Sequence, residues 1–340
     1  MERRLLGLSD MKPQHMTRVK KLKLVAVAII ATSHLIAASA LGSHDKTVGV
    51  LGDSVATGAV SDHGLQARFW SIATTLITNF GTDFPKNAFT MVTASGFGVK
   101  SENVINAAVD GKRVDDIAGQ TQALLKKTKV LPDYVFLSFT ANDACSEEIF
   151  DESIDAFRAK YSKSLIEGAN GVAGLRYLVR QAPKDRDTSI YLLASLNFAQ
   201  VLTNPSILDR KVRLHNSVVR CERFRAGEHK DDGRMTYLAD KLKMMCPAIL
   251  GTAPFEQDER SRFRRQHLAE IHRAMLDEQQ RAIAILNNEN KNPRLKLKYI
   301  GSPGQMEFQG HHVANDCFHL SPEGQGLLGI TIWQEIFDGL

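Results

Sequence analysis

The sequence lacks the residue spacings that build zinc sites. Its 340 residues include four cysteines and 11 histidines, yet neither a Cys-x-x-Cys nor a His-x-x-x-His spacing occurs, so zinc is not expected. The neighbouring residues His311 and His312 have no third ligand nearby in the sequence, and a polar loop is their expected role. We therefore expect no metal ion, and nothing in the sequence calls for an organic cofactor.

Beyond the N-terminal 40 residues, the chain has no excess of positive over negative residues. Residues 1–40 carry seven Lys or Arg against two Asp or Glu, while the rest of the chain carries 36 of each kind. A neutral body argues against a nucleic-acid partner. The length allows one large domain or two modest ones, and no internal repeat or low-complexity segment is visible.

Long apolar runs are absent as well. The apolar run at 24–36 is interrupted by three polar residues and is shorter than the roughly 20 residues of a membrane span. A basic stretch at 17–23 precedes it and small residues at 38–40 follow it, which is typical of a secretory signal peptide. We expect cleavage near Ala40 and a secreted or periplasmic mature chain, 41–340, without a stable transmembrane anchor. An uncleaved anchor is the alternative.

The cysteines are few but even in number. In an exported chain an even count predicts disulfide bonds. Four cysteines allow three connectivities, and the sequence does not choose among them. The residues concerned are Cys145, Cys221, Cys246 and Cys317.

Short apolar runs alternate with amphipathic stretches along the body. The predicted strands are at 47–51, 103–109, 134–139, 190–196 and 295–300. The predicted helices are at 69–80, at 114–127, around Ile154 to Leu165, around Leu268 to Met275, and at 321–337. This alternation predicts an α/β fold with a parallel sheet covered by helices on both faces. Functional groups of such folds gather at the carboxyl ends of the strands.

Almost a hundred residues separate the fourth and fifth predicted strands, far more than a crossover needs. We expect 197–292 to include an insertion that forms a lid or a wall beside the site. Within it, 205–265 carries 14 basic and nine acidic residues and ends with arginines at 260, 262, 264 and 265. In one interpretation these charges form the solvated face of a helix. In the other they form a basic surface that attracts anionic headgroups or phosphates toward the site.

Two motifs at opposite ends of the body carry the chemistry. Ser54 follows the first predicted strand in Gly52-Asp53-Ser54, and Asp316 stands three residues before His319. A nucleophile, a base and a group that orients the base are what acyl-ester hydrolysis needs. Taken singly, Ser54 is more simply interpreted as a helix cap, Asp316 as a turn carboxylate and His319 as a surface histidine.

Two residues between these motifs are candidates for stabilising an oxyanion. Gly111 follows the second predicted strand and would offer a backbone N–H, and Asn142 follows the third and would offer a side-chain amide. Taken singly, each is also compatible with an ordinary turn.

The order of these motifs resembles the four blocks of the SGNH, or GDSL, hydrolase superfamily. The matching residues are Gly52-Asp53-Ser54, then Asn106 and Gly111, then Asn142-Asp143, then Asp316-x-x-His319. The resemblance spans about 47–340 and implies a flavodoxin-like three-layer α/β/α sandwich. It implies that Ser54, Asp316 and His319 form a catalytic triad. It also implies an oxyanion hole made by the N–H groups of Ser54 and Gly111 and the amide of Asn142.

Three details refine the resemblance. Thr140 stands where the third block usually has glycine, which leaves the backbone approach at that position open. The segments around Asn142 and His319, including Asp-Cys-Phe-His, are similar to the branch that contains phospholipase B and acyloxyacyl hydrolase. The absence of a Gly-x-Ser-x-Gly elbow argues against an ordinary α/β-hydrolase lipase.

The expected function is that of an exported serine esterase or lipase. The favoured substrate is a phospholipid-like acyl ester at an anionic lipid surface, with long chains preferred over acetyl groups and with activity weakened by salt. A carbohydrate O-deacetylase or acyltransferase with the same triad is the alternative enzyme. A non-catalytic binding module on the same fold is the alternative of another class; loss of a triad residue would mark it, and none is lost.

Overall fold

A computed structural model shows the fold of this chain. It describes residues 46–58, 97, 99, 103–168, 174–213, 218–226, 243, 244, 246–254 and 257–337, all within one compact unit. The predicted signal peptide and the predicted helix at 69–80 lie outside the described residues.

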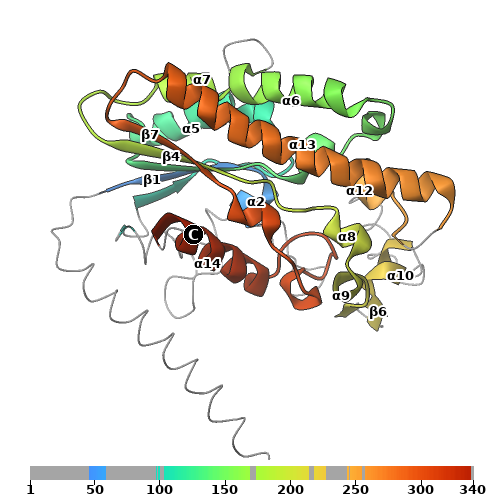
Figure 1. The fold of residues 1–340 in the computed structure, drawn as a ribbon. Helices are drawn as coiled ribbons and strands as arrows, with labels where there is room; N and C mark the ends of the chain where they lie inside the picture. The colour runs from blue at the N-terminus through green and yellow to red at the C-terminus, as the bar shows by residue number, and fades with distance from the viewer. Residues whose placement is uncertain are drawn as a thin grey trace, which may run out of the picture. The chain divides into compact units, whose positions relative to one another are not determined.

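Five parallel strands form the central sheet (Figure 1), in the order β2-β1-β3-β4-β7. Their bounds are Val48–Gly52 for β1, Val104–Asn106 for β2, Tyr134–Ser138 for β3, Thr188–Leu193 for β4 and Leu295–Ile300 for β7. All five strands predicted from the sequence are present. The parallel three-layer fold is confirmed.

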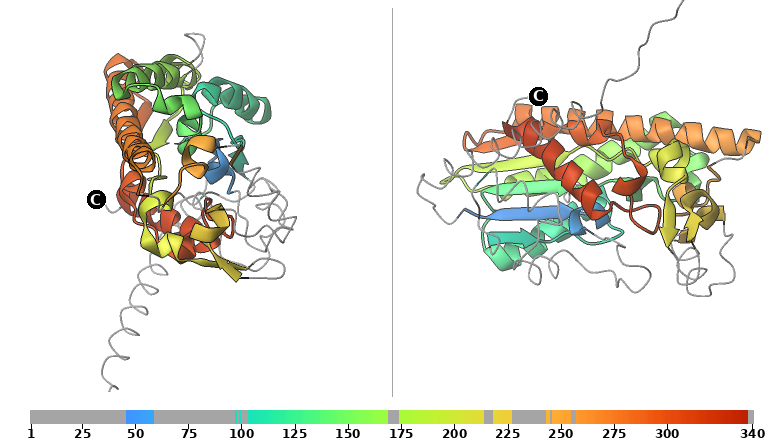
Figure 2. Two further views of the ribbon diagram at one scale, coloured as in Figure 1. Left: turned by 90° about the vertical axis from the view of Figure 1, so that its right-hand side faces the viewer. Right: turned by 90° about the horizontal axis from the view of Figure 1, so that it is seen from below.

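Helices cover both faces of the sheet (Figures 1 and 2). One face carries α5 (Ile117–Thr128), α6 (Ile154–Glu167), α7 (Leu175–Arg180) and α13 (Glu259–Glu289). The other face carries α14 (Pro322–Phe337), which Figure 2 shows crossing the strands. Because both faces are covered, the central strands β1, β3 and β4 are largely apolar, as expected for a buried parallel sheet. The edge strand β7 alternates instead, and its residues Lys296 and Lys298 are exposed.

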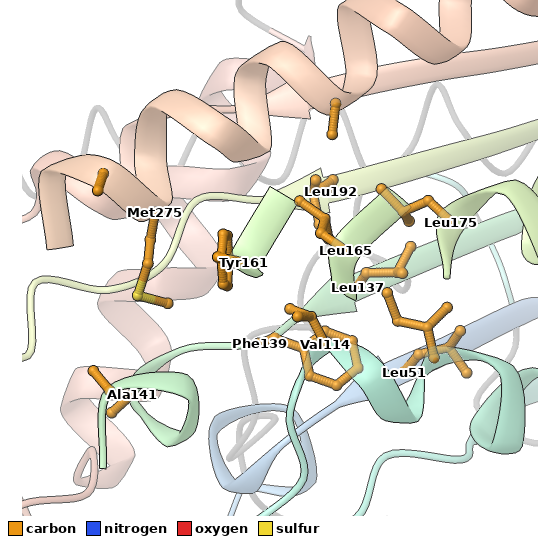
Figure 3. Packing of buried hydrophobic residues seen from close by; sticks show 14 of the residues in the cluster. Leu51, Val114, Leu137, Phe139, Ala141, Tyr161, Leu165, Leu175, Leu192 and Met275 are labelled. Atoms are coloured by element: carbon orange, nitrogen blue, oxygen red, sulfur yellow. The ribbon is translucent and has the colours of Figure 1, made fainter. Parts of the chain in front are cut away.

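Successive strand residues point into different cores, as the two-residue period of a strand requires. Leu51, Leu137 and Leu192 belong to the core under α5, α6, α7 and α13, which Figure 3 shows from close by. Their neighbours Val50 and Phe136 belong to the core under α14. Because the strands pack into a core on each face, the sheet is held between two layers of helices. This packing also holds the loops that follow the carboxyl ends of the strands.

The second strand is shorter than the seven residues predicted at 103–109. It ends at Asn106 because this side chain turns the backbone: its Oδ1 accepts the Ala108 N–H at 2.8 Å. The amide of Asn106 donates to the Ala56 carbonyl oxygen at 2.9 Å. The side chain thus ties the end of β2 to the turn that follows β1.

The long connection from β4 to β7 contains both the crossover helix and additional structure. The 31-residue helix α13 is the crossover itself. Before it lie several short elements: α8 (Gln200–Thr203), α9 (Pro205–Leu208), β5 (Lys211–Arg213), β6 (Val218–Arg220), α10 (Cys221–Ala226) and α12 (Pro247–Leu250). The strands β5 and β6 form an antiparallel pair. The name "inserted segment" is used below for residues 197–258.

Both disulfide bonds join the inserted segment to a loop of the remaining fold. Cys246 bonds to Cys145, and Cys221 bonds to Cys317. All four cysteines are thereby paired. Disulfide formation, predicted from the even count, is present, and the structure supplies the pairing that the sequence left open.

Candidate active site

Ser54 lies where β1 turns into the short helix α2 (Ser54–Thr57). Gly52 has a φ of 147°, and a Cβ there would lie 2.1 Å from the carbonyl oxygen of Ser138. Only glycine fits this turn. Asp53 is the helix cap, because its Oδ1 accepts the Val55 N–H at 3.0 Å. The alternative in which Ser54 caps the helix is therefore wrong.

Asp316 and His319 contact each other directly. Asp316 Oδ2 lies 2.5 Å from His319 Nδ1, and both side chains are buried. The other carboxylate oxygen, Oδ1, accepts the N–H groups of Phe318 and His319, each at 3.0 Å. With Nδ1 bonded to the carboxylate, Nε2 is the ring nitrogen suited to act as a base. The alternative surface position of His319 is excluded, whereas Asp316 does lie in a turn.

The pair shifts the pKa of each partner. Burial alone would raise the pKa of Asp316, but the His319 charge and hydrogen bond, with the two N–H donors, lower it. Burial alone would lower the pKa of His319, but the charge and hydrogen bond of Asp316 raise it. The charges of Asp110 and Asp53 raise it further. The Asp316 carboxylate thus stabilises the imidazolium form of His319. A histidine takes this form when it accepts a proton as a general base.

One pocket brings together Ser54, Asn142 and His319. Its volume is about 50 Å³. The rest of its wall is mainly apolar and includes Leu196, Phe198, Ile207, Phe308, Phe318 and Leu320. Three residues far apart in the sequence thus share one small apolar cavity at the carboxyl edge of the sheet.

Gly111 lies in a neighbouring cleft and not in this pocket. Its φ of 74° requires glycine or strains another residue, and a Cβ there would touch nothing within 4 Å. The cleft has a volume of about 810 Å³ and includes Asn142 in its wall. Asn142 is therefore shared by the two cavities.

The Asn142 amide is held by two acceptors. Its Nδ2 donates to the Lys112 carbonyl oxygen at 3.1 Å and lies 3.4 Å from Asp53 Oδ2. The Lys112 bond is the stronger of the two by distance. A ligand oxygen would therefore replace Asp53 Oδ2 as the acceptor of this amide more easily than it would replace the Lys112 carbonyl oxygen.

Thr140 has a contact that the sequence motifs did not indicate. Its N–H and its hydroxyl both donate to Asp53 Oδ2, at 2.6 and 2.7 Å. Asp53 is fully buried; burial raises its pKa, and the hydrogen bonds from Thr140 and Val55 oppose that shift. Where the resemblance has glycine, this chain has a threonine that supplies a hydroxyl donor to the residue next to Ser54.

Two further carboxylates surround the site. Burial raises the pKa of Asp143 to about 7, against the hydrogen bond from the Val114 N–H. Asp110 accepts a hydrogen bond from the hydroxyl of Thr57 in α2. Neither contact was expected from the sequence, because each joins residues that are well separated along the chain.

The basic residues at the end of the 205–265 segment are not all solvated. Arg264 is buried, with Nε donating to the Thr252 hydroxyl at 2.9 Å and a 2.6 Å ion pair from its guanidinium to Glu147. Arg265 donates to the Ala253 carbonyl oxygen at 2.7 Å. Neither interpretation of these charges, as a solvated helix face or as a contact with anionic headgroups, holds for the buried Arg264. Arg264 and Arg265 instead bond the start of α13 to Thr252, Glu147 and Ala253.

The described residues contain no group of three or more His, Cys, Asp or Glu side chains that could hold a metal ion. His312 Nδ1 accepts the Gln309 N–H at 3.0 Å, within the loop that also contains His311. Among the described helices, none is long and apolar enough to cross a membrane.

Comparison with known proteins finds likeness only at the level of structure. No model of a protein family matches this chain, and no curated protein matches it. The crystal structure of a lipase/acylhydrolase from Enterococcus faecalis is 16% identical, with a TM-score of 0.38, over 86% of this chain and 95% of that one. An extracellular lipase from Streptomyces rimosus is 12% identical, with a TM-score of 0.43, over 85% of this chain and 99% of that one. Function is therefore inferred from the site.

The sequence predicts that the Asn142 amide donates to an oxyanion during ester hydrolysis. On that prediction Asn142→Ala should lower kcat by about 10²–10³-fold with a small change in KM. The amide is already oriented by Lys112 and Asp53, so it costs little reorganisation during the reaction. Steady-state kinetics on a nitrophenyl ester measure both constants. A rise in KM with kcat unchanged would show instead that Asn142 positions the substrate.

Proposed function

We propose that this protein is a carboxylic ester hydrolase of the SGNH type that works through an acyl-enzyme. The Ser54 hydroxyl attacks the ester carbonyl carbon while His319 Nε2 accepts the hydroxyl proton. The bond from the acyl carbon to the alcohol oxygen then breaks, and His319 donates the proton to the departing alcohol. A water molecule then attacks the acyl-Ser54 ester, again through His319, and releases the acid. The observation that carries the proposal is the pocket shared by Ser54 and His319, whose ring is bonded to Asp316.

The tetrahedral intermediates of both steps carry a negative oxygen. The Asn142 amide and the backbone N–H groups of Ser54 and Gly111 are the donors that we assign to it. Asn142 lines the same pocket as Ser54, which supports its role. Gly111 lines the adjoining cleft together with Asn142, so its N–H would approach the oxyanion from that side.

A lipid acyl ester is the proposed substrate class. The aromatic and aliphatic wall beside Ser54 suits an alkyl chain and offers few partners to a hydroxylated acyl group. Burying each methylene of an acyl chain there is worth about 0.8 kcal/mol. An exposed basic residue such as Arg262 is compatible with an anionic lipid surface, although Arg264 is not available for that role.

A carbohydrate O-deacetylase is the second candidate, because of the sizes of the two cavities. The apolar pocket of about 50 Å³ suits a short acyl group, while the adjoining cleft of about 810 Å³ has room for a large alcohol. Pockets for drug-sized ligands are typically about 300–1,000 Å³. The length of the acyl chain therefore separates the two substrate classes.

Export is part of the proposal. The basic and apolar N-terminal stretches of the sequence support a signal peptide cleaved near Ala40. Two disulfide bonds support a secreted or periplasmic location, since such bonds persist in oxidising compartments.

A series of nitrophenyl esters from acetyl to dodecanoyl, tested on the purified protein, examines both activity and substrate class. For a lipid substrate we expect kcat/KM to rise about fourfold per added methylene and to keep rising beyond octanoyl. A maximum at acetyl or propionyl would replace the lipid by the deacetylase. Complete absence of turnover on every ester would favour the non-catalytic binding module.

A further inference from the structure

The Cys221–Cys317 disulfide reaches into the loop that carries the candidate base. Cys317 stands between Asp316 and His319 in the sequence, and its sulfur is bonded to Cys221 in the inserted segment. Both cysteines are fully buried and pack with Val212 and Phe224. The disulfide thus joins the loop that contains Asp316 and His319 to the inserted segment, through two cysteines that are 96 residues apart in the sequence.

The backbone at Cys317 has an unusual conformation. Its φ is 60°, and among the described residues Lys129 is the other non-glycine with a positive φ. This left-handed region is unfavourable for a residue that has a Cβ. A residue persists there when the surrounding structure over-determines it. The buried disulfide is a constraint of that kind.

This left-handed residue closes the turn that brings the base and its carboxylate together. The Cys317 N–H donates to the Ala314 carbonyl oxygen at 3.0 Å, and the Ala314 N–H donates to the His319 carbonyl oxygen at 2.8 Å. Inside this turn, Asp316 Oδ1 accepts the N–H groups of Phe318 and His319, and Oδ2 contacts the ring of His319. A change of φ at Cys317 would move His319 relative to Asp316.

The inserted segment holds the same loop at further points. Arg210, which precedes β5, donates to the Gly310 carbonyl oxygen at 2.6 Å and to Asn315 Oδ1 at 3.3 Å. The Arg210 carbonyl oxygen accepts the Cys221 N–H at 2.8 Å. The disulfide and Arg210 therefore form one connection, from the β5–α10 region to the residues just before and after Asp316.

We propose that Cys317 is a positioning residue for the candidate base: its left-handed backbone, held by the disulfide to Cys221, sets the contact between Asp316 and His319. Through this bond the inserted segment acts on the active site itself, beyond any role as a wall. The catalytic consequence rests on the proposed function, whereas the geometric consequence for His319 does not.

The other disulfide provides a matched control. Cys145 and Cys246 are 101 residues apart, against 96 for Cys221 and Cys317, so removal of either bond relaxes a similar length of unfolded chain. Cys145 is bonded to the segment before α12 and not to the loop of Asp316. Opening this bond should leave the His319 pKa as it is.

Three double variants test the proposal: C221A/C317A, C221A/C317G and C145A/C246A. The His319 pKa is measured by NMR titration of the imidazole, kcat and KM by ester hydrolysis, and folding by circular dichroism. In C221A/C317A, alanine disfavours the left-handed backbone, so the His319 pKa should fall below that of the wild-type protein and kcat should fall at least tenfold with little change in KM. In C221A/C317G, glycine accepts that backbone, and the raised pKa should be kept. Asp110 and Asp53, whose charges also raise the His319 pKa, are unchanged in all three.

A wild-type His319 pKa in C221A/C317A would overturn the proposal, as would an equal fall in C221A/C317G. If the alanine variant does not fold, the glycine variant decides alone, and a His319 pKa clearly below that of the wild-type protein there would contradict the positioning role. Should the NMR shifts follow the expectation while no variant and no wild-type protein hydrolyses any ester, the proposed function fails and the positioning inference stands.

Discussion

Ester hydrolysis by the Ser54→Ala variant is expected to fall about 10⁶-fold, as it does when the nucleophile of a triad is removed. The substitution deletes the attacking oxygen and nothing else of consequence. Ser54 is the half-buried first residue of α2, and the cap of that helix comes from Asp53. The fold should therefore be retained, which circular dichroism and thermal unfolding can verify.

A fluorophosphonate probe locates the nucleophile independently. It should label the wild-type protein at Ser54 and should leave the variant unlabelled. Ser189→Ala is the matched control, since Ser189 is a half-buried serine near the amino end of β4, away from the carboxyl edge where the pocket lies. Labelling of the wild-type protein at another serine would refute the assignment.

The variants of Ser54 and His319 should not be additive. His319→Ala alone should cause a loss similar to that of Ser54→Ala, and the double variant should be little worse, because members of a triad act as a unit. Two independent losses that multiply would mean that the two residues act in separate steps. That result would contradict the proton transfer proposed here.

The fold could be predicted because its central strands are buried on both faces. Such strands are apolar almost throughout, so the sequence predicts the runs at 47–51 and 134–139. The edge strand at 295–300 alternates instead, with Leu295 and Leu297 buried and Lys296 and Lys298 exposed. The predicted ends of the strands were less accurate. β2 stops at Asn106 because its side chain bonds to the Ala108 N–H and to the Ala56 carbonyl oxygen, and the second of these contacts depends on the folded chain.

The candidate site was recognised from the order of its motifs, not from spacing alone. The structure brings Ser54, Asn142 and His319 to one pocket, while their catalytic roles remain predictions. The bonds from Thr140 to Asp53 join residues 87 apart in the sequence. No local pattern indicates such a pair, and a threonine at a position expected for glycine gave no sign of its partner.

A count of basic residues does not predict which arginines are exposed, because some of them are buried in the fold. Both interpretations of the arginines that end the 205–265 segment require solvent-accessible side chains, but Arg264 is buried and paired with Glu147, 117 residues earlier. A count of charges cannot distinguish a solvated guanidinium from one that holds a helix in place. The pairing of the cysteines was undetermined for a similar reason, since several connectivities satisfy the same sequence.

Asp316→Asn is expected to lower kcat by about 10⁴-fold, because an amide favours the wrong tautomer of the base that it contacts. The contact at issue is the 2.5 Å bond between Asp316 Oδ2 and His319 Nδ1. The side-chain amide introduced by this substitution would offer an N–H to Nδ1 and would leave the proton on Nε2. His319 could then no longer accept the proton of Ser54.

The pH dependence gives a second readout of the same change. A general base works in its neutral form, so kcat/KM rises as the pH passes upward through the pKa of His319 in the free enzyme. Asp316 raises that pKa above the usual 6.5, so the wild-type acid limb should have its midpoint above pH 6.5. Loss of the carboxylate charge should move the midpoint to lower pH.

The control for Asp316→Asn is Asp187→Asn. Asp187 is an exposed carboxylate that pairs with Arg294 before β7, so its loss should change neither kcat nor the midpoint. In the Asp316 variant, burial still lowers the His319 pKa and the charges of Asp110 and Asp53 still raise it, so the midpoint should move to lower pH. An unchanged midpoint together with a fall in kcat of less than tenfold would mean that Asp316 does not orient His319. Asp316 would then not belong to a catalytic triad.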